Sequence, residues 1–269
     1  MKQHSIKRPV TIAGIGLHTG KASKMTFKYA EAGSGINFIR TDLEGRPKVM
    51  ASLENVSGTA RGTNLGIVNT VEHVLSALYA MSVTNLNIEM DGPEPPAADG
   101  SSMGLVALIR SAGLVEQGPM KRTIRVKEPL VVFGKDSAIT ALPHNGLTVS
   151  FMINYPSDFI GSQFYRFENS EKGYEREIAP ARTFGFLSEL DELKSKGLAL
   201  GASAKNAIVI GDKGYNTPLR FPDELVRHKI LDLIGDISIL NSDIRAHIIC
   251  VRSGHELNIE LAKKLKEVG

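Results

Sequence analysis

The stretch FPDELVRHKILDLIGD (Phe221–Asp236) is the main sequence evidence for a fold of two similar halves, because its centre has a partial repeat earlier in the chain. VRHKILDL (Val226–Leu233) matches VEHVLSAL (Val71–Leu78) in one histidine and in the spacing of several apolar residues. A second short repeat pairs the Gly-Lys turn at 20–21 with the Gly-Lys turn at 134–135. The two halves of the chain also share one order of expected elements: strands, helix, strand, loop, helix. Together these patterns indicate an ancient duplication.

The expected elements predict an α+β fold of two similar halves packed together, each half a sheet covered by helices. Apolar alternation and glycine-marked turns predict strands at 8–17, 23–30, 36–40, 85–90, 123–134, 137–146, 147–155 and 246–251. Apolar residues at helical spacing predict helices near 70–81, 103–111, 223–237 and 253–267.

The division between the halves is expected in GLVEQGPMKR (Gly113–Arg122), which has the composition of a linker. The first α+β domain is then 1–116 and the second is 122–269. The second half carries extra material at about 193–211, which we interpret as a small inserted strand–helix–strand piece.

The composition limits the class of protein. Apolar residues make up 42% of the 269 residues, enough for a packed core, and the net charge of +3 suits an anionic small molecule better than a nucleic acid. The single cysteine, Cys250, lies in an apolar run and fits a reducing compartment. The N-terminus lacks an apolar signal segment, and no run reaches 18 apolar residues. We therefore expect a cytoplasmic protein without stable membrane insertion, and a monomer.

The helix at 223–237 has two distinct faces. Its apolar stripe consists of Val226, Ile230, Leu233 and Ile237. His228, Asp232 and Asp236 form a polar row on roughly the opposite side, and residues four apart are neighbours on a helix surface. His228 and Asp232 are therefore placed to offer a ring nitrogen and a carboxylate oxygen to one ion, and zinc accepts both. A His–Asp pair on a solvated face has the same spacing. Asp236, as a supporting carboxylate, and Lys229, as a cation beside an oxyanion, favour the metal-site interpretation.

Two residues at the start of the helix at 70–81 could complete such a site. His73 would be the third ligand, and Glu72 would be a base that takes a proton from water activated by the metal. Glu72 equally fits a capping box with Asn69, so the spacing leaves both interpretations open.

A fourth histidine, His255, begins the last helix, where the helix dipole disfavours an imidazolium. If His255 donates a proton, a carboxylate must keep it charged, and Asp236 is a candidate. The alternative is an ordinary exposed histidine beside a capping box of Ser253 and Glu256. The run HELNI lacks the second histidine of H-E-x-x-H, so peptidase chemistry of that type is not indicated.

The motifs in combination closely resemble the UDP-3-O-acyl-N-acetylglucosamine deacetylase family, the zinc enzymes of the committed step of lipid A biosynthesis. The matching stretches are GIGLHTG (14–20), TVEHVLSAL (70–78), DGPEPPAADGS (91–101), ARTFGF (181–186), NAIVI (206–210), VRHKILDLIGD (226–236) and GHELN (254–258). Each stretch alone is modest, but their order and separation across nearly the whole chain are specific.

The resemblance implies a zinc site made of His73, His228 and Asp232. For the other positions it implies the general base Glu72, the general acid His255 with its partner Asp236, the carbonyl-polarising Thr183 and the substrate-supporting Lys229. It also implies an acylated UDP-amino-sugar substrate, release of acetate, and an apolar passage at 193–211 for the acyl chain. Neither the preferred acyl length nor the residues that hold the UDP group follow from it.

Two other functions remain open from the residues. A zinc amidase for another N-acyl compound would share every catalytic residue, although the apolar insert favours a lipidated substrate. A phosphate- or RNA-binding module is the non-enzymatic alternative, but the mild charge and the absence of tryptophan and of interleaved basic and aromatic residues disfavour it. Two imidazoles and one carboxylate suit Fe²⁺ as well as Zn²⁺, so either metal could serve in cells.

Overall fold

Each half of the chain builds one main sheet, and the two sheets share one pattern of strand pairing. In the computed structural model, which describes residues 2–157 and 159–269, the first sheet has the order β2 (Val10–Ile15), β3 (Ala22–Tyr29), β8 (Leu86–Met90), β4 (Ile36–Arg40), β5 (Lys48–Met50). The second has the order β11 (Leu130–Phe133), β12 (Ala138–Pro143), β18 (Asp243–Val251), β13 (Leu147–Asn154), β14 (Ser162–Glu168). In both orders the third and fourth strands pair parallel and the other neighbours pair antiparallel. The expected α+β fold of two similar halves is therefore confirmed.

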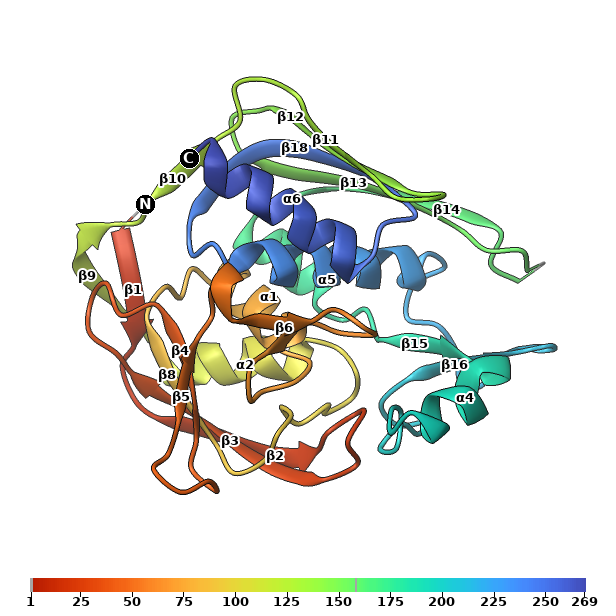
Figure 1. Ribbon diagram of the computed structural model, residues 1–269, viewed down its shortest axis with the longest axis horizontal. Helices are drawn as coiled ribbons and strands as arrows, with labels where there is room; N and C mark the ends of the chain where they lie inside the picture. The colour runs from red at the N-terminus through yellow and green to blue at the C-terminus, as the bar shows by residue number, and fades with distance from the viewer. Residues whose placement is uncertain (1, 158) are drawn as a thin grey trace.

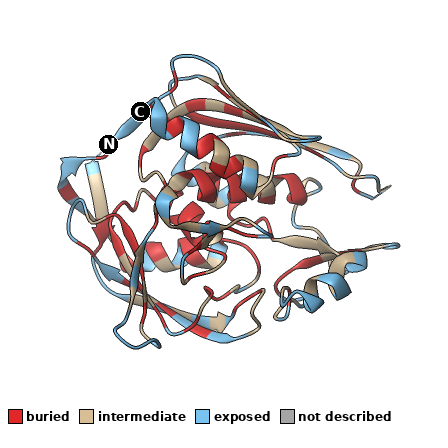
Figure 2. Cartoon of the chain, in the orientation of Figure 1, coloured by how far each residue is buried: buried red, intermediate tan, exposed pale blue. Residues whose placement is uncertain are grey.

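The helices lie between the two sheets (Figure 1). The first half contributes α1 (Glu72–Ala80) and α2 (Met103–Ala112), and the second contributes α5 (Glu224–Ser238) and α6 (His255–Glu267). Figure 2 shows buried residues concentrated along these helices and the strands that face them. Alternating strand residues supply the other side of this core, as in β18, where Ile244, Ala246, Ile248 and Cys250 are buried. The layered order brings α1 and α5, one from each half, against each other at the centre.

The stretch expected to be a linker is a strand. Residues Leu114–Met120 form β9, which pairs antiparallel with β1 (Lys2–Ile6) at the N-terminus. Gln117 of β9 is buried and accepts a hydrogen bond from the Asn85 side chain at 2.7 Å. The partner strand is distant in sequence, so local composition could not reveal the pairing. The boundary between domains 1–116 and 122–269 stays a prediction.

The insert in the second half contains the expected strand–helix–strand, but it begins earlier than residue 193. It consists of β15 (Phe184–Phe186), α4 (Leu190–Ser195), β16 (Ile208–Gly211) and β17 (Gly214–Tyr215), with β15 and β16 parallel. The insert is hydrogen-bonded to the first half, since the Gly201 amide donates to the Leu17 carbonyl at 3.0 Å. A Cβ on Gly201 would lie 2.1 Å from the Gly16 carbonyl oxygen, so this junction requires glycine.

Shorter elements complete the chain. They are β6 (Val56–Gly58), β7 (Asn64–Leu65), β10 (Thr123–Arg125) and the helical turns η1 (Leu53–Asn55), α3 (Glu171–Gly173), η2 (Tyr174–Ile178) and η3 (Leu187–Glu189). Among the residues that the structure describes, none of the helices combines the length and the apolar character needed to cross a bilayer.

Candidate active site

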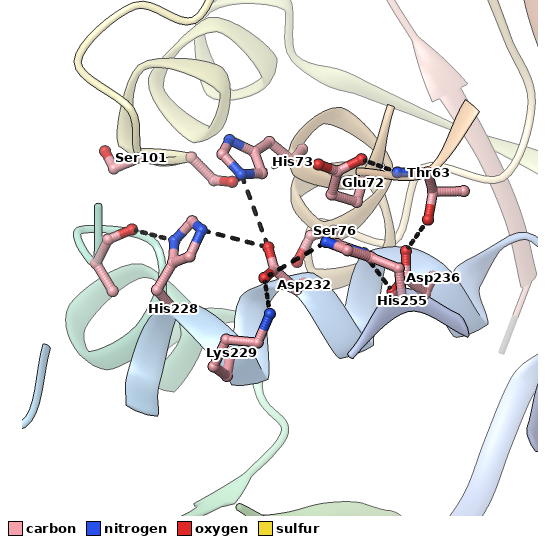
Figure 3. A network of polar contacts seen from close by, with 12 residues as sticks. Thr63, Glu72, His73, Ser76, Ser101, His228, Lys229, Asp232, Asp236 and His255 are labelled. Atoms are coloured by element: carbon pink, nitrogen blue, oxygen red, sulfur yellow. Dashed lines mark hydrogen bonds and ion pairs between the residues drawn. The ribbon is translucent and has the colours of Figure 1, made fainter. Parts of the chain in front are cut away.

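The helices α1 and α5 cross at close backbone contact, and a group of polar side chains lies at that crossing (Figure 3). Gly235 permits the contact, because a Cβ there would lie 2.1 Å from the Glu72 carbonyl oxygen. His73 stands near the start of α1, while His228 and Asp232 stand one turn apart on α5. The crossing therefore directs side chains from both halves to one point.

His73, His228 and Asp232 converge as the sequence predicted. The Asp232 Oδ1 atom lies 3.7 Å from His73 Nε2 and 3.3 Å from His228 Nε2. One ligand atom from each of the three lies within 4.8 Å of the others. His228 and Asp232 are each 3% exposed, so the alternative of a solvated polar face is wrong.

The protonation states of the three residues fit a metal cation. Burial lowers the pKa of His73 to about 3 and also lowers the pKa of His228, so both rings are neutral at pH 7. His228 Nδ1 faces the Ala181 carbonyl at 3.1 Å, and a proton on that nitrogen leaves the Nε2 lone pair toward Asp232. Burial opposes ionisation of Asp232, but Lys229 and the neighbouring histidines lower its pKa. Two neutral imidazoles and one carboxylate form a donor set that suits zinc or iron.

Glu72 lies beside this group and does not cap its helix. Glu72 is 2% exposed, and its Oε2 accepts a hydrogen bond from the Thr63 amide at 2.8 Å. The helix α1 begins at Glu72 itself, with Val71 before it, so the capping box with Asn69 is wrong. Burial raises the pKa of Glu72 to about 7. Such a carboxyl accepts and releases a proton near neutral pH.

His255 faces the same point from the start of α6. Its Nδ1 lies 2.9 Å from Asp236 Oδ2, as the sequence argument required. Burial lowers the pKa of His255, but the charge and hydrogen bond of Asp236, with the charges of Asp232 and Glu72, outweigh burial and raise it to about 9. Ligand atoms of Glu72, Asp232 and His255 lie within 4.8 Å of one another. A carboxyl with a pKa near 7 and a cationic imidazole therefore lie on either side of the Asp232 carboxylate.

The capping box expected at the start of α6 is also wrong. Gly254 precedes this helix, and the Ser253 hydroxyl donates to Asn258 Oδ1 at 2.8 Å. Asn258 Nδ2 in turn donates to Asp236 Oδ2 at 2.8 Å. Ser253 thus orients the amide that supports Asp236.

Lys229 and Thr183 also reach the site. Lys229 Nζ donates to Asp232 Oδ2 at 2.7 Å. Desolvation opposes its charge, but Asp232 raises the pKa of Lys229 above its ordinary value. The backbone of Thr183 is fixed on both sides, since its amide donates to Gly100 and its carbonyl accepts from Ile208.

A cavity of about 400 Å³ opens over these residues. Its lining includes the predicted residues Glu72, His73, Thr183, His228, Lys229, Asp232 and His255. Asp236 lies outside the lining, fully buried behind His255. A second, largely apolar cavity of about 100 Å³ shares part of this wall and continues under the insert, where Leu190, Leu193, Ala202, Ala207 and Val209 line it.

Sequence reasoning missed supporting groups on three residues: the Thr63 backbone and hydroxyl, the Asn258 amide and the Ala181 carbonyl. Asn258 lies within the GHELN motif, so its position carried a signal that we did not interpret. The Ala181 carbonyl is a backbone group, and Thr63 lies outside every quoted motif, so neither had a side-chain pattern to find.

Comparison with known proteins gives one family, the family that the sequence motifs resemble. The family model described as LpxC: UDP-3-O-acyl N-acetylglycosamine deacetylase matches residues 3–267. A protein named UDP-3-O-acyl-N-acetylglucosamine deacetylase from Geobacter sp. (strain M21) is 41% identical over 98% of this chain and 88% of its own length. Proteins of the same name from Trichormus variabilis and Bdellovibrio bacteriovorus are 40% and 36% identical over 98% of this chain, and over 98% and 89% of their own lengths.

Proposed function

The chain belongs to the family of UDP-3-O-acyl-N-acetylglucosamine deacetylases, and we propose that it hydrolyses the N-acetyl group of that UDP-sugar in lipid A biosynthesis, releasing acetate. The observation that carries the proposal is the meeting of a carboxyl base, a cationic acid and a metal-suited donor set within one cavity.

The proposal includes a metal ion held by His73, His228 and Asp232. The donor set favours Zn²⁺, with Fe²⁺ as the alternative in cells. When bound, such an ion would polarise the acetyl carbonyl and make water a stronger acid. The neutral rings and the ionised carboxylate described above support this assignment.

Glu72 acts as the general base in this proposal. It removes a proton from the water that attacks the acetyl carbon, and the hydroxide oxygen forms the new C–O bond. Its raised pKa suits the task, because the carboxylate is a stronger base than an exposed glutamate yet is still populated near neutral pH. The Thr63 amide holds one oxygen of Glu72, which orients the carboxylate toward the cavity.

His255 acts as the general acid. Asp236 holds Nδ1, so the protonated Nε2 is the group that faces Asp232 and the cavity. It gives its proton to the sugar nitrogen as the C–N bond breaks, and the nitrogen leaves as a neutral amine. Glu72 has gained one proton and His255 has lost one, so a proton exchange with solvent restores both groups.

The remaining residues would serve binding and charge stabilisation. Thr183 and Lys229 line the cavity where the carbonyl oxygen becomes negative, and both can donate hydrogen bonds there. The apolar cavity under the insert offers a place for the 3-O-acyl chain. The cytoplasmic location, the monomeric state and the absence of nucleic-acid binding stay predictions.

The direct test measures acetate release from UDP-3-O-acyl-N-acetylglucosamine by the purified protein. Activity should disappear on chelation and return when Zn²⁺ or Fe²⁺ is added. Failure of the folded, metal-replete protein to release acetate would overturn the substrate assignment, and activity that resists complete metal removal would overturn the metal.

A further inference from the structure

Thr63 contacts the two groups that the proposed reaction needs for proton transfer. We propose that Thr63 is a positioning residue whose amide fixes the base Glu72 and whose hydroxyl fixes Asp236, and through it the acid His255. The inference rests on the proposed function. It adds a residue that holds both groups in one geometry.

The contacts of Thr63 are short and buried. Its amide donates to Glu72 Oε2 at 2.8 Å, and its Oγ1 donates to Asp236 Oδ1 at 2.6 Å. Thr63 is 0% exposed, so water does not compete for either bond. Figure 3 shows Thr63 between the two carboxylates, which come from α1 and α5. One residue therefore links functional groups from both halves of the chain.

The backbone of Thr63 is held independently of its side chain. Its carbonyl accepts a hydrogen bond from the Val71 amide at 3.0 Å, immediately before α1. The neighbouring Gly62 lies so close that a Cβ there would be 3.2 Å from Glu72 Oε1. Because backbone bonds hold this segment, replacement of the hydroxyl by a methyl group should leave the loop and the Glu72 contact in place.

The Asp236 carboxylate divides its two oxygens between different partners. Oδ1 accepts from Thr63, while Oδ2 accepts from His255 Nδ1 and from Asn258 Nδ2. Together these donors fix the rotation of the carboxylate about its Cβ–Cγ bond. Loss of the Thr63 hydroxyl leaves the buried Oδ1 atom of Asp236 without this donor, and a buried acceptor without its donor is unfavourable. The carboxylate is then free to rotate. His255 would then lose its fixed direction toward the leaving nitrogen.

The first test compares Thr63→Val with Thr63→Ser. Valine keeps the shape and the amide but removes the hydroxyl, whereas serine keeps the hydroxyl. We expect Thr63→Val to lower kcat by at least about tenfold, with KM and metal content near wild type, and Thr63→Ser to restore most of kcat. Thr148→Val, a buried threonine in β13 away from the cavity, is the matched control and should retain wild-type kcat.

A double-mutant cycle separates positioning from general structural damage. If the hydroxyl acts through His255, Thr63→Val should cause little further loss in a His255→Gln background. Full additivity, unchanged kcat in Thr63→Val, or equal losses in the serine and valine variants would overturn the inference.

A spectroscopic measurement tests Thr63 without turnover. The His255 Nδ1 proton, followed by NMR in the metal-loaded protein, should shift in Thr63→Val and keep its position in Thr63→Ser and Thr148→Val. An unshifted resonance in Thr63→Val would overturn the positioning role. Because this measurement needs no substrate, it distinguishes failure of the Thr63 inference from failure of the proposed deacetylation, which the wild-type acetate assay reports.

Discussion

His73 and His228 occupy corresponding places in the two halves, and their rings meet edge to face with centroids 5.0 Å apart. Each lies in the helix that precedes the central strand of its sheet, β8 for His73 and β18 for His228. The correspondence ends one turn later, where α5 has Asp232 and α1 has Ala77. A symmetric pair of helices thus carries an asymmetric site, with one carboxylate shared between two histidines.

Removal of one proposed ligand should abolish tight metal binding. His73→Ala and Asp232→Ala each delete one of three donors, so we expect metal affinity to fall by more than about 100-fold. This exceeds the usual loss of affinity when a residue that hydrogen-bonds a metal ligand is removed. Metal content after competition with a chelator measures the effect. His144→Ala, at an exposed histidine directly after β12 and outside the cavity lining, is the control. Stoichiometric metal in His73→Ala would refute the ligand set.

The close crossing of α1 and α5 predicts that Gly235 tolerates no side chain. In Gly235→Ala the new Cβ would meet the Glu72 backbone at 2.1 Å, so the helices must separate. We expect a loss of unfolding free energy of about 3 kcal/mol, together with weaker metal binding. Chemical denaturation measures the first effect.

Gly104→Ala in α2 is the matched control for Gly235→Ala, since a Cβ there meets no described atom within 4 Å. It should be neutral or slightly stabilising, because alanine favours a helix over glycine. Equal stability of the two alanine variants would contradict the close-crossing argument.

The sequence predicted relations between residues of one helix correctly, and it failed where a side chain or strand has a partner outside the local pattern. Spacing along one helix predicted that His228, Asp232 and Asp236 share a face, because helical geometry alone sets that relation. The capping boxes failed because other polar groups bind the residues expected to cap: the Thr63 amide donates to Glu72, and the Ser253 hydroxyl donates to the Asn258 side chain. The pairing of β1 with β9 was missed for the same reason, since both partners must be known before either shows a pattern. The polar row of α5 is likewise buried because α1 packs against it, and the sequence of α5 alone does not show this packing.

The pH dependence of turnover should have two limbs. Glu72 must be ionised, so activity rises with pH up to the pKa of Glu72, about 7. A bound cation favours the carboxylate and would move this acid limb to lower pH. His255 must be protonated, so activity falls as pH passes about 9. Because the Asp236 charge raises the pKa of His255 against the effect of burial, Asp236→Asn should move the alkaline limb to lower pH. The pH profile of kcat/KM checks this, and an unmoved alkaline limb in Asp236→Asn would assign that limb to another group.

The apolar cavity under the insert predicts where acyl length is selected. Ala207 lies on its wall and is 7% exposed, so Ala207→Leu should fill space that the far end of an acyl chain would otherwise occupy. We expect kcat/KM to fall for substrates with long 3-O-acyl groups and to stay near wild type for short ones, because the catalytic residues are untouched. A series of substrates that differ only in acyl length measures the effect. An equal loss of kcat/KM at every acyl length would contradict this prediction. It would mean that the substitution disturbs β16 or the catalytic cavity and that the acyl chain lies outside the apolar cavity.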